Sequence, residues 1–512
     1  MVQKDFLIIG AGIAGLSYAL KVARKWPEAK IMVLSKEGFE NSNTQYAQGG
    51  IAGVLPSSDD EVDTHVQDTL IAGNFENNKD VVEMVLNEAS DSIFDLIQWG
   101  VMFDKDKQGH YKLGLEGGHS EKRVLHRRDY TGREIQDKLL KTANSLPNIE
   151  MLSHHFALEL ITSKKDPSKA VGAYIYDAEN EKVETVVSKI LFLATGGVGQ
   201  VYRNTTNPNV ATGDGIALAY RIGAEVEGME LVQFHPTALF GDDGERAFLI
   251  SEAVRGAGAI LRNENGEAYM QRYDDRKELA PRDIVSRANL SEIKKSTIPY
   301  VYLDVTHLKQ DKFKKEFPVI SEKCKELGLN LSKDYIPVAP AAHYLCGGII
   351  VDIHGKSSIK GMYGCGECSY TGLHGTNRLA SNSLLEAVVF ANQSFKKLTE
   401  EFDDLEFETE VDDFWHPVFR KNFAIDLPLS ELRKRLQWYM STYMAVEKTD
   451  KNIELMQSQL NDINDTFEDI ILDKPYTIKS LEFRNLLTIA KLIIEQSANR
   501  IKNSGVFYNS DL

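Results

Sequence analysis

The feature that most constrains the fold is a glycine-rich turn near the start of the chain, Gly10-Ala11-Gly12-Ile13-Ala14-Gly15. It follows the apolar run Phe6-Leu7-Ile8-Ile9 and precedes Leu16-Ser17-Tyr18-Ala19-Leu20, so we expect a strand, a turn and a helix. In this context the first glycine permits the tight turn, the second lets the backbone approach a pyrophosphate, and the third lets helix and strand pack closely. The pattern predicts a dinucleotide site, with phosphate charge facing the helix N-terminus.

The second expected strand, over 30–36, disfavours NAD as that dinucleotide. In NAD-binding folds this strand usually ends in an acidic residue that binds the ribose hydroxyls. Here Ser35 holds that place, and Glu37 lies beyond Lys36. The loop 41–50 that follows is polar, ends in two glycines and is dense in hydrogen-bonding groups. Both features leave room for a different dinucleotide.

A second glycine motif, Gly364-Cys365-Gly366-Glu367, lies far along the chain. The polar loop 372–383 then leads into an apolar segment typical of a helix. A strand that enters a glycine turn with an acid, followed by such a loop, could place amides and an acceptor over a second part of the dinucleotide. We therefore expect the cofactor site to be built from both motifs, with an insertion between them.

Composition limits the class of protein. The chain has 512 residues and a formal net charge of -16, which argues against a nucleic-acid-binding protein because such proteins carry a basic surface. Only four cysteines occur, so a disulfide framework is not expected and a reducing compartment fits. No apolar run approaches the ~18 residues of a membrane-spanning helix, and the first residues lack a secretory signal pattern. We expect a globular, cytoplasmic protein.

The order of motifs predicts three domains. The strand, glycine and helix pattern is lost between about 226 and 345 and returns from 346. We expect a discontinuous dinucleotide-binding domain over 1–225 and 346–398, an inserted domain over 226–345, and a helical domain over 399–512. Helices are expected near 61–100, 430–447 and 481–498, with Ser430 as a possible N-cap, and alternation over 171–187 predicts a β-hairpin.

Four polar clusters in or beside the inserted segment are candidates for an active site. They contain arginine, which suits bidentate recognition of carboxylates, and histidine, which can donate a hydrogen bond to the same group. Taken singly, each cluster is more often structural, and spacing alone does not show that they converge. The clusters are Gln233-Phe234-His235-Pro236-Thr237, Ser251-Glu252-Ala253-Val254-Arg255-Gly256, Ala280-Pro281-Arg282-Asp283 and Pro340-Ala341-Ala342-His343-Tyr344.

The pair Cys365 and Cys368 has the C-x-x-C spacing of metal and redox sites. A zinc site would normally need a second pair or histidines at short spacing, which Cys324 and Cys346 do not supply. We therefore expect no metal, and interpret the two cysteines as small residues in a turn that faces the cofactor.

Together these stretches resemble the succinate dehydrogenase and fumarate reductase flavoprotein family, and within it most closely the branch that oxidises L-aspartate. The resemblance covers nearly the whole chain. It implies an α/β FAD-binding Rossmann-like domain with an inserted α+β capping domain and a C-terminal helical domain. The motifs that carry it are Tyr46-Ala47-Gln48-Gly49-Gly50-Ile51, Glu116-Gly117-Gly118-His119-Ser120, Ala194-Thr195-Gly196-Gly197, Thr212-Gly213-Asp214-Gly215, Gln233 to Leu239, Ala280 to Val285, and Tyr370-Thr371-Gly372-Leu373-His374-Gly375.

The resemblance implies FAD as the cofactor and assigns residues to it. These residues fall in the opening glycine turn, the polar loop after the second strand, and the second glycine motif. They are Ala11, Gly12, Ile13, Ala14, Lys36, Asn43, Thr44, Gln45, Tyr46, Ala47, Gln48, Gly49, Gly50, Asp214, Glu367, Ser383 and Leu384.

The resemblance also implies residues for a dicarboxylate substrate. His235, His343 and Arg378 would hold the carboxylates, with Gln233 and Ser251 nearby. In the same comparison Arg282 matches the proton-transfer arginine of the family, and Arg255 matches a substrate-orienting position.

Two positions separate the branches of the family. Membrane-complex members attach FAD through a histidine just before the threonine of the polar loop, where this chain has Asn43, so the flavin is expected to be non-covalent. Glu116 matches a residue expected to meet a substrate ammonium. A fixed glutamate would repel a carboxylate but favour an ammonium, which selects an amino acid.

The implied activity is oxidation of L-aspartate to iminoaspartate with reduction of FAD, and reoxidation by oxygen or by fumarate. The resemblance further implies coupling to quinolinate synthase in the pathway to NAD. Two alternatives stay open: a soluble fumarate reductase, and an electron-transfer subunit that works only with an iron–sulfur partner. Asn43 and Glu116 speak against both.

Overall fold

The computed structural model describes residues 1–512 except 57, 59, 242–245, 409 and 412–416. Among these residues, the largest sheet has seven strands in the order β6-β2-β1-β9-β8-β7, with β16 also paired to β9. The strands β6, β2, β1, β9 and β16 pair in parallel. β8 and β7 extend the sheet beyond β9 by antiparallel pairing. The strands are β1 (Val2–Ile9), β2 (Ile31–Leu34), β6 (Ile149–Leu152), β7 (His155–Thr162), β8 (Ala170–Asp177), β9 (Lys182–Leu193) and β16 (Met362–Gly364).

The predicted strand, glycine turn and helix are confirmed at the start of the chain. Helix α1 (Ile13–Lys25) begins directly after Gly12. Gly10 has a positive φ of +115°, and a Cβ there would lie 2.1 Å from the carbonyl oxygen of Ala194, after β9. A Cβ on Gly15 would lie 2.0 Å from the Gly10 oxygen. The turn therefore requires glycine where β1, β9 and α1 approach one another most closely.

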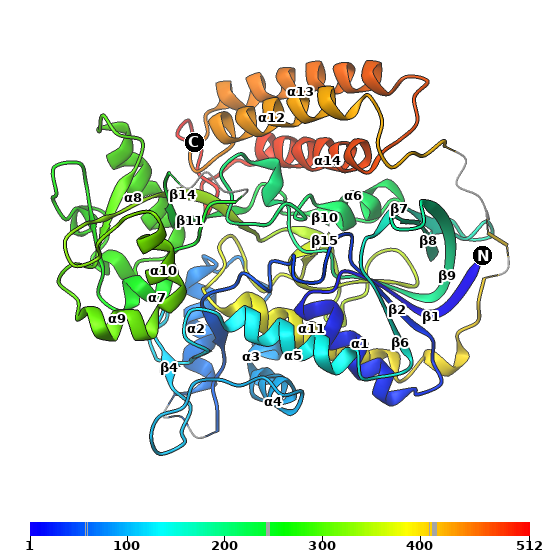
Figure 1. Cartoon of the computed structure of the whole chain (residues 1–512), viewed down its shortest axis with the longest axis horizontal. Coiled ribbons are helices and arrows are strands. Elements are labelled where there is room, and N and C mark those ends of the chain that lie inside the picture. Colours follow the sequence, from blue (N-terminus) through cyan, green and yellow to red (C-terminus); the bar gives the residue numbers. More distant parts are fainter. Residues whose placement is uncertain (57, 59, 242–245, 409, 412–416) are drawn as a thin grey trace.

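The two distant glycine motifs lie side by side, as the sequence predicts. β16 pairs in parallel with β9 through Tyr363 and Phe192. Helix α11 (Asn382–Leu398) is buried along most of its length and packs against α1, which in turn packs against α5 (Thr131–Ala143). Figure 1 shows these three helices together beside the sheet. The parallel strands are thus buried between layers, which explains their nearly continuous apolar sequences.

A four-stranded antiparallel sheet with its own hydrophobic core lies within the segment expected to be inserted. Its strands are β11 (Val232–Leu239), β12 (Ile260–Arg262), β13 (Val301–Asp304) and β14 (Ile336–Leu345). Its helices are α7 (Glu252–Gly256), α8 (Arg282–Lys294), α9 (Gln310–Glu316) and α10 (Pro318–Glu326). The green part of Figure 1 shows this unit at one end of the molecule. The α+β class expected for it is confirmed, and the domain limits stay predictions.

The C-terminal helices are α12 (Asp426–Tyr443), α13 (Asp450–Ile471) and α14 (Ile478–Asn499). The prediction that Ser430 caps the first of them is wrong. Ser430 lies inside α12, where its hydroxyl donates to the carbonyl oxygen of Asp426 at 2.8 Å. α14 packs against α6 (Asp214–Arg221), so the helical segment reaches the cofactor-binding part of the chain.

Shorter elements complete the fold. The helices expected over 61–100 are confirmed as α2 (Val62–Ala72), α3 (Lys79–Asn87) and α4 (Ala89–Gln98). One small sheet contains β3 (Gly50–Ala52), β4 (Leu113–Gly114) and β5 (Val124–His126). Another contains β10 (Val226–Glu227), β15 (Gly348–Ile350) and β17 (Ser369–Tyr370). Over the described residues, no helix is both long and apolar enough to cross a membrane.

The close approach at Gly10 gives a test of the fold. We expect Gly10→Ala to lower the free energy of unfolding by about 2–3 kcal/mol more than Gly328→Ala, because a Cβ at Gly10 meets backbone atoms. Gly328 also has a positive φ, +78°, but a Cβ there has nothing within 4 Å. Urea titration followed by circular dichroism measures both, and equal losses would contradict this account of the turn.

Candidate active site

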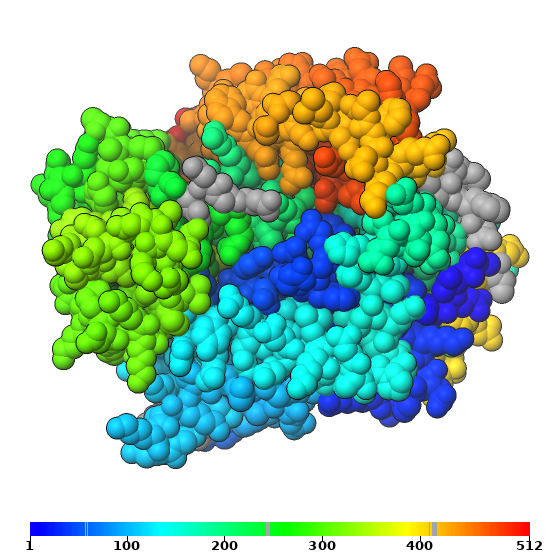
Figure 2. Space-filling model, in the orientation of Figure 1, coloured from blue at the N-terminus to red at the C-terminus, as the bar shows by residue number. Residues whose placement is uncertain are grey.

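A cavity opens at the carboxyl ends of the parallel strands and runs toward the inserted segment. Ile9 and Leu34, the last residues of β1 and β2, and Ala194, just after β9, form part of its wall. This is where open α/β sheets bind ligands. The far wall is formed by His235 of β11 and His343 of β14, together with the start of α8. Figure 2 shows the inserted segment, the N-terminal segment and the C-terminal helices meeting on one face.

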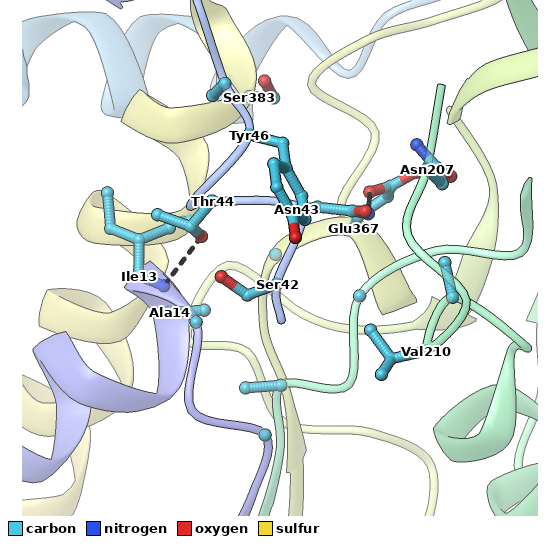
Figure 3. A pocket seen from close by; sticks show the side chains of 18 of the residues that line it. Ile13, Ala14, Ser42, Asn43, Thr44, Tyr46, Asn207, Val210, Glu367 and Ser383 are labelled. Atoms are coloured by element: carbon cyan, nitrogen blue, oxygen red, sulfur yellow. Dashed lines mark hydrogen bonds between the residues drawn. The ribbon is translucent and has the colours of Figure 1, made fainter. Parts of the chain in front are cut away.

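The N-terminus of α1 faces this cavity. Its N-cap residue, Gly12, has no side chain to accept from the first amides, and the first turn of α1 contains no acidic residue. Thr44 Oγ1 accepts from the backbone N–H of Ile13 at 3.0 Å, the hydrogen bond drawn in Figure 3. A Cβ on Gly12 would meet only this hydroxyl, at 3.2 Å. A helix end with free donors and little steric cover fits a pyrophosphate.

Asn43 and Glu367 join the polar loop 41–50 to the second glycine motif across the cavity. Asn43 Nδ2 donates to Glu367 Oε2 at 2.8 Å, and both side chains are visible in Figure 3. The backbone N–H of Leu345 donates to the other carboxylate oxygen at 3.1 Å. Burial raises the pKa of Glu367 to about 7. The Oδ1 atom of Asn43 is buried without a partner, so this corner offers a free acceptor to a bound ring.

Lys36 lies in the cavity wall, but protein groups occupy its three N–H donors. Its Nζ donates to Thr212 Oγ1 at 2.6 Å, Asp214 Oδ2 at 2.8 Å and Glu482 Oε1 at 2.6 Å. Although burial alone would lower it, these carboxylates raise the pKa of Lys36. Lys36 therefore joins the end of β2 to α6 and α14. Sequence reasoning did not assign Glu482, because a helix far along the chain gives no local sign of this contact.

The residues of this half fit FAD as the sequence comparison implied. The uncapped helix end suits its pyrophosphate, and the orphaned oxygens of Asn43 and Asn207 suit polar ring atoms. Gly196 has a positive φ of +73°, and a Cβ there would have only Asn43 Nδ2 within 4 Å, which leaves room for a flat ring. Of the residues predicted for FAD, Gln45 does not line the cavity. The others do, and they are Ala11, Gly12, Ile13, Ala14, Lys36, Asn43, Thr44, Tyr46, Ala47, Gln48, Gly49, Gly50, Asp214, Glu367, Ser383 and Leu384.

Two guanidinium groups meet at the other end of the cavity on one amide oxygen. Arg282 Nη1 and Arg378 Nε donate to Gln233 Oε1 at 3.0 and 3.3 Å. Arg282 Nε also donates to Glu252 Oε2 at 2.5 Å, and the Arg378 guanidinium lies 4.1 Å from the ring centre of Tyr344. Burial, and then Arg282, lower the pKa of Arg378 to about 10, so it remains charged at neutral pH. Two adjacent cations in a buried wall suit a substrate with two carboxylates.

His235 and His343 add two neutral donors to this wall. Their ring centres lie 5.0 Å apart in a T-shaped arrangement. Burial, followed by the nearby arginines and, for His235, by His343, lowers the pKa of both imidazoles well below the usual value. Both rings are therefore uncharged at neutral pH, and each can offer one N–H to a carboxylate.

Two carboxylates complete this end of the cavity. Glu116 Oε2 accepts from Ser381 Oγ at 2.6 Å, and burial, then Glu252, raise the pKa of Glu116. Although burial would raise it, Arg255 and Arg282 lower the pKa of Glu252. Glu252 therefore offsets the positive charge of Arg255 and Arg282. Of the two carboxylates, Glu116 is the one for which the described contacts include no ion pair with an arginine.

The predicted substrate residues divide into two groups. Glu116, His235, Ser251, Arg282, His343 and Arg378 line the cavity. Gln233 and Arg255 do not. Gln233 lies behind the two arginines, and Arg255 is completely buried behind Glu252, with Nη2 3.0 Å from Glu252 Oε1.

Several cavity residues carry no assignment from the sequence. Glu252 was part of a recognised polar cluster, and its spacing of three residues from Arg255 was the available signal. Thr206 and Asn207 belong to the polar run Thr205-Thr206-Asn207, which lies between glycine motifs and could have drawn attention. Tyr344 follows His343 directly and Ser381 lies two residues before Ser383, and both also line the wall.

The cysteines of the C-x-x-C pair have hydrogen-bond partners of their own. Cys365 Sγ donates to the Ala387 oxygen and Cys368 Sγ to the Leu193 oxygen, each at 3.3 Å. Both are buried free thiols, and Cys365 lines the cavity.

Comparisons with known proteins agree with this geometry. A protein family described as "FAD binding domain" matches residues 5–384. The L-aspartate oxidase of Yersinia pestis is 40% identical over 515 residues, covering 99% of this chain and 96% of the relative, and a chloroplastic L-aspartate oxidase of Oryza sativa subsp. japonica is 39% identical, covering 99% and 81%. Among solved structures, E. coli quinol fumarate reductase FrdA with the E245Q mutation is similar at a TM-score of 0.90 with 29% identity, covering 99% and 92% of the two chains.

The neutral histidines predict how dicarboxylate binding depends on pH. With Glu116→Gln removing the acid beside the arginines, we expect the Kd for succinate to change less than about threefold from pH 6.5 to 8; Glu367, whose pKa is about 7, lies on the cofactor side of the cavity, where Asn43 donates to it. If either imidazole had to be protonated, binding would weaken about tenfold per pH unit above its pKa. Because both pKa values are lowered, the two rings stay neutral over this whole range, so their protonation does not change and binding should stay constant. A steady rise of the constant above pH 6.5 would contradict the neutral assignment.

The Lys36 contact predicts a role for α14 in stability. We expect Glu482→Gln to lower the free energy of unfolding by about 1–2 kcal/mol, because it leaves a mostly buried ammonium with one carboxylate fewer. Glu495→Gln is the matched control on the same helix. Its ion pair with Lys491 is exposed, so the loss should stay below about 0.5 kcal/mol. Urea titration of both variants is the measurement, and equal effects would speak against the Lys36 contact.

Proposed function

The chain belongs to the L-aspartate oxidase family of FAD-binding proteins, and we propose that it oxidises L-aspartate to iminoaspartate. The observation that carries this proposal is the position of Glu116. It lies in the same cavity as Arg282, Arg378, His235 and His343. An acid among four carboxylate-binding groups would be unfavourable for a plain dicarboxylate, but it matches a substrate that also carries an ammonium.

The reaction removes a hydride from the substrate Cα and a proton from its nitrogen, so the carbon–nitrogen single bond becomes double. A bound FAD would supply the hydride acceptor, and its reoxidation would use oxygen, which gives hydrogen peroxide, or fumarate. The side chains of this cavity supply binding and orientation. Fixing both carboxylates against one wall restricts the substrate to a single pose, which removes much of the entropic barrier to hydride transfer.

Arg282 and Arg378 would hold the carboxylates, and the contact of both guanidiniums with Gln233 supports this role. His235 and His343 would add neutral donors. Arg282 would also stabilise developing charge or assist proton transfer, since its Nε donates to Glu252, which is itself ion-paired with Arg255. In this arrangement Arg255 acts through Glu252 rather than by touching substrate.

Glu116 would receive the substrate ammonium. Ser381 donates to one of its oxygens, and the other lies toward Gly49, where a Cβ would come within 2.8 Å of it. A bound ammonium would favour the ionised form of Glu116 and so offset the effect of burial on its pKa. The selectivity for an amino acid over succinate would therefore rest largely on this carboxylate.

We also propose that FAD is bound without a covalent link, because Asn43 offers an amide where membrane-complex members of the family have a histidine. Release of all flavin on acid precipitation of the protein tests this point.

Coupling to quinolinate synthase in NAD biosynthesis, and a cytoplasmic location, are further proposals that rest on the sequence resemblance. A soluble fumarate reductase is the alternative favoured by the similarity to quinol fumarate reductase.

Substitution of Glu116 separates these functions. We expect Glu116→Gln to lower kcat/KM for L-aspartate about 100-fold, because one partner of a buried charge pair is lost. The Kd for succinate should stay within about threefold of wild type or become smaller. Initial rates of hydrogen peroxide formation and flavin difference spectra measure the two quantities.

Wild-type protein provides the control. It should form hydrogen peroxide with L-aspartate and not with succinate. Flavin reduction by succinate, or by a substrate only in the presence of a partner protein, would contradict the proposal and favour one of the alternatives. An equal loss for both ligands in Glu116→Gln would contradict the role given to this residue.

A further inference from the structure

The hydroxyl of Thr206 lies 2.7 Å from Nδ1 of His343 and belongs to a segment with no assigned role. We propose that Thr206 fixes the single proton of His343 on Nε2, and so makes this imidazole a permanent hydrogen-bond donor to a substrate carboxylate. Thr206 would be a positioning residue, acting through His343. The inference rests on the proposed function, because it concerns the carboxylate wall of the same cavity.

The direction of this hydrogen bond follows from the other groups around Thr206. A hydroxyl can donate or accept, so the distance alone does not say which atom carries the proton. The nearest alternative acceptor is the Ala342 carbonyl oxygen, 3.5 Å from Thr206 Oγ1. That oxygen already accepts from the backbone N–H of Thr206 at 3.0 Å and from Thr205 Oγ1 at 2.9 Å. Two closer donors thus occupy that oxygen and its contact with the Thr206 hydroxyl is long, so in this proposal the hydroxyl donates to His343 Nδ1.

A neutral imidazole has one N–H and one lone pair. The lone pair of His343 is on Nδ1, where Thr206 donates, so the proton is on Nε2. Burial and the two neighbouring arginines lower the pKa of His343, which agrees with a single proton on the ring. The reverse tautomer would turn a lone pair toward a substrate carboxylate, and two acceptors facing each other repel.

His235 reaches the same state by a different route. The backbone N–H of Thr237 donates to His235 Nδ1 at 3.2 Å, and a backbone amide can only donate. Its proton is therefore on Nε2, which is buried without a partner in the protein. The two rings thus present matching neutral donors in one wall. The backbone holds one of them, whereas the other depends on a side chain that can be replaced.

The contact also connects segments far apart in the sequence. Thr205 and Ala342 form a parallel bridge, and Asn207 Nδ2 donates to the His343 carbonyl oxygen at 3.0 Å. The loop that carries Thr206 is therefore fixed against β14 by contacts that do not involve its hydroxyl. Removing the hydroxyl should change the tautomer of His343 without displacing the strand.

Replacement of Thr206 tests the proposal in the FAD-loaded protein. Thr206→Val removes the hydroxyl at similar size and should raise the Kd for succinate about tenfold, the loss of one donor to a charged group. Thr206→Ser keeps the hydroxyl and should bind within about twofold of wild type. Thr466→Val, at an exposed position on α13, is the control and should bind as wild type. The Kd for FAD should be unchanged in all three.

A double substitution excludes a merely structural effect. The side-chain amide of glutamine keeps an N–H whatever Thr206 does, so Thr206→Val should add little to the effect of His343→Gln, and the two changes should not be additive. Nitrogen-15 spectra of histidine-labelled protein without substrate give a second readout. They should show His343 protonated on Nε2 in wild type and a mixture of tautomers in Thr206→Val.

Three binding results would each overturn the proposal. They are a Kd for succinate in Thr206→Val equal to that of wild type, a Kd for succinate in Thr206→Ser as high as in Thr206→Val, and a loss of FAD affinity that parallels the loss of succinate affinity. So would an unchanged nitrogen-15 spectrum. These results are independent of turnover. If wild-type protein bound succinate but formed no hydrogen peroxide with L-aspartate, the proposed function would fail while the role of Thr206 was still decided by the binding and spectral data.

Discussion

Two buried guanidinium groups that share one amide oxygen are the interaction on which the substrate half of the cavity depends. Arg282 comes from the start of α8 and Arg378 from the loop before α11, and Gln233 of β11 joins them. Like charges this close repel strongly in a poorly solvated wall, so each needs a partner of its own. Glu252 supplies it for Arg282, and the ring of Tyr344 supplies it for Arg378. The wall is complete only when these elements are assembled.

The same two cations add to the effect of burial on their neighbours. Burial first, and then the arginines, lower the pKa values of His235 and His343, so these rings donate hydrogen bonds without adding charge. Glu116 stands apart, because burial and Glu252 raise its pKa rather than lower it. A bound ammonium would reverse that effect. The electrostatics of the wall thus favour a ligand with two negative groups and one positive group.

The cofactor half is built on a different principle, since backbone rather than charge dominates its centre. The uncapped end of α1 and the glycines around it leave donors and space for a pyrophosphate. At its margin, Lys36 ties the end of β2 to Asp214 and to Glu482 of α14. The C-terminal helices therefore contribute to this half although they contain none of its sequence motifs.

The glycine turn at 10–15, the parallel strands and the periodic helices could be predicted from local patterns, because these depend on residues a few positions apart. Local signals misled at Ser430, whose hydroxyl satisfies a carbonyl inside α12 instead of capping it. Which polar groups face the cavity could not be predicted in this way and follows from the folded arrangement. Gln233 turns behind the arginines, whereas Glu252 and Thr206 turn into the wall. Side-chain direction at such positions depends on the packing of strands and loops far apart in the chain, and no local pattern records that packing.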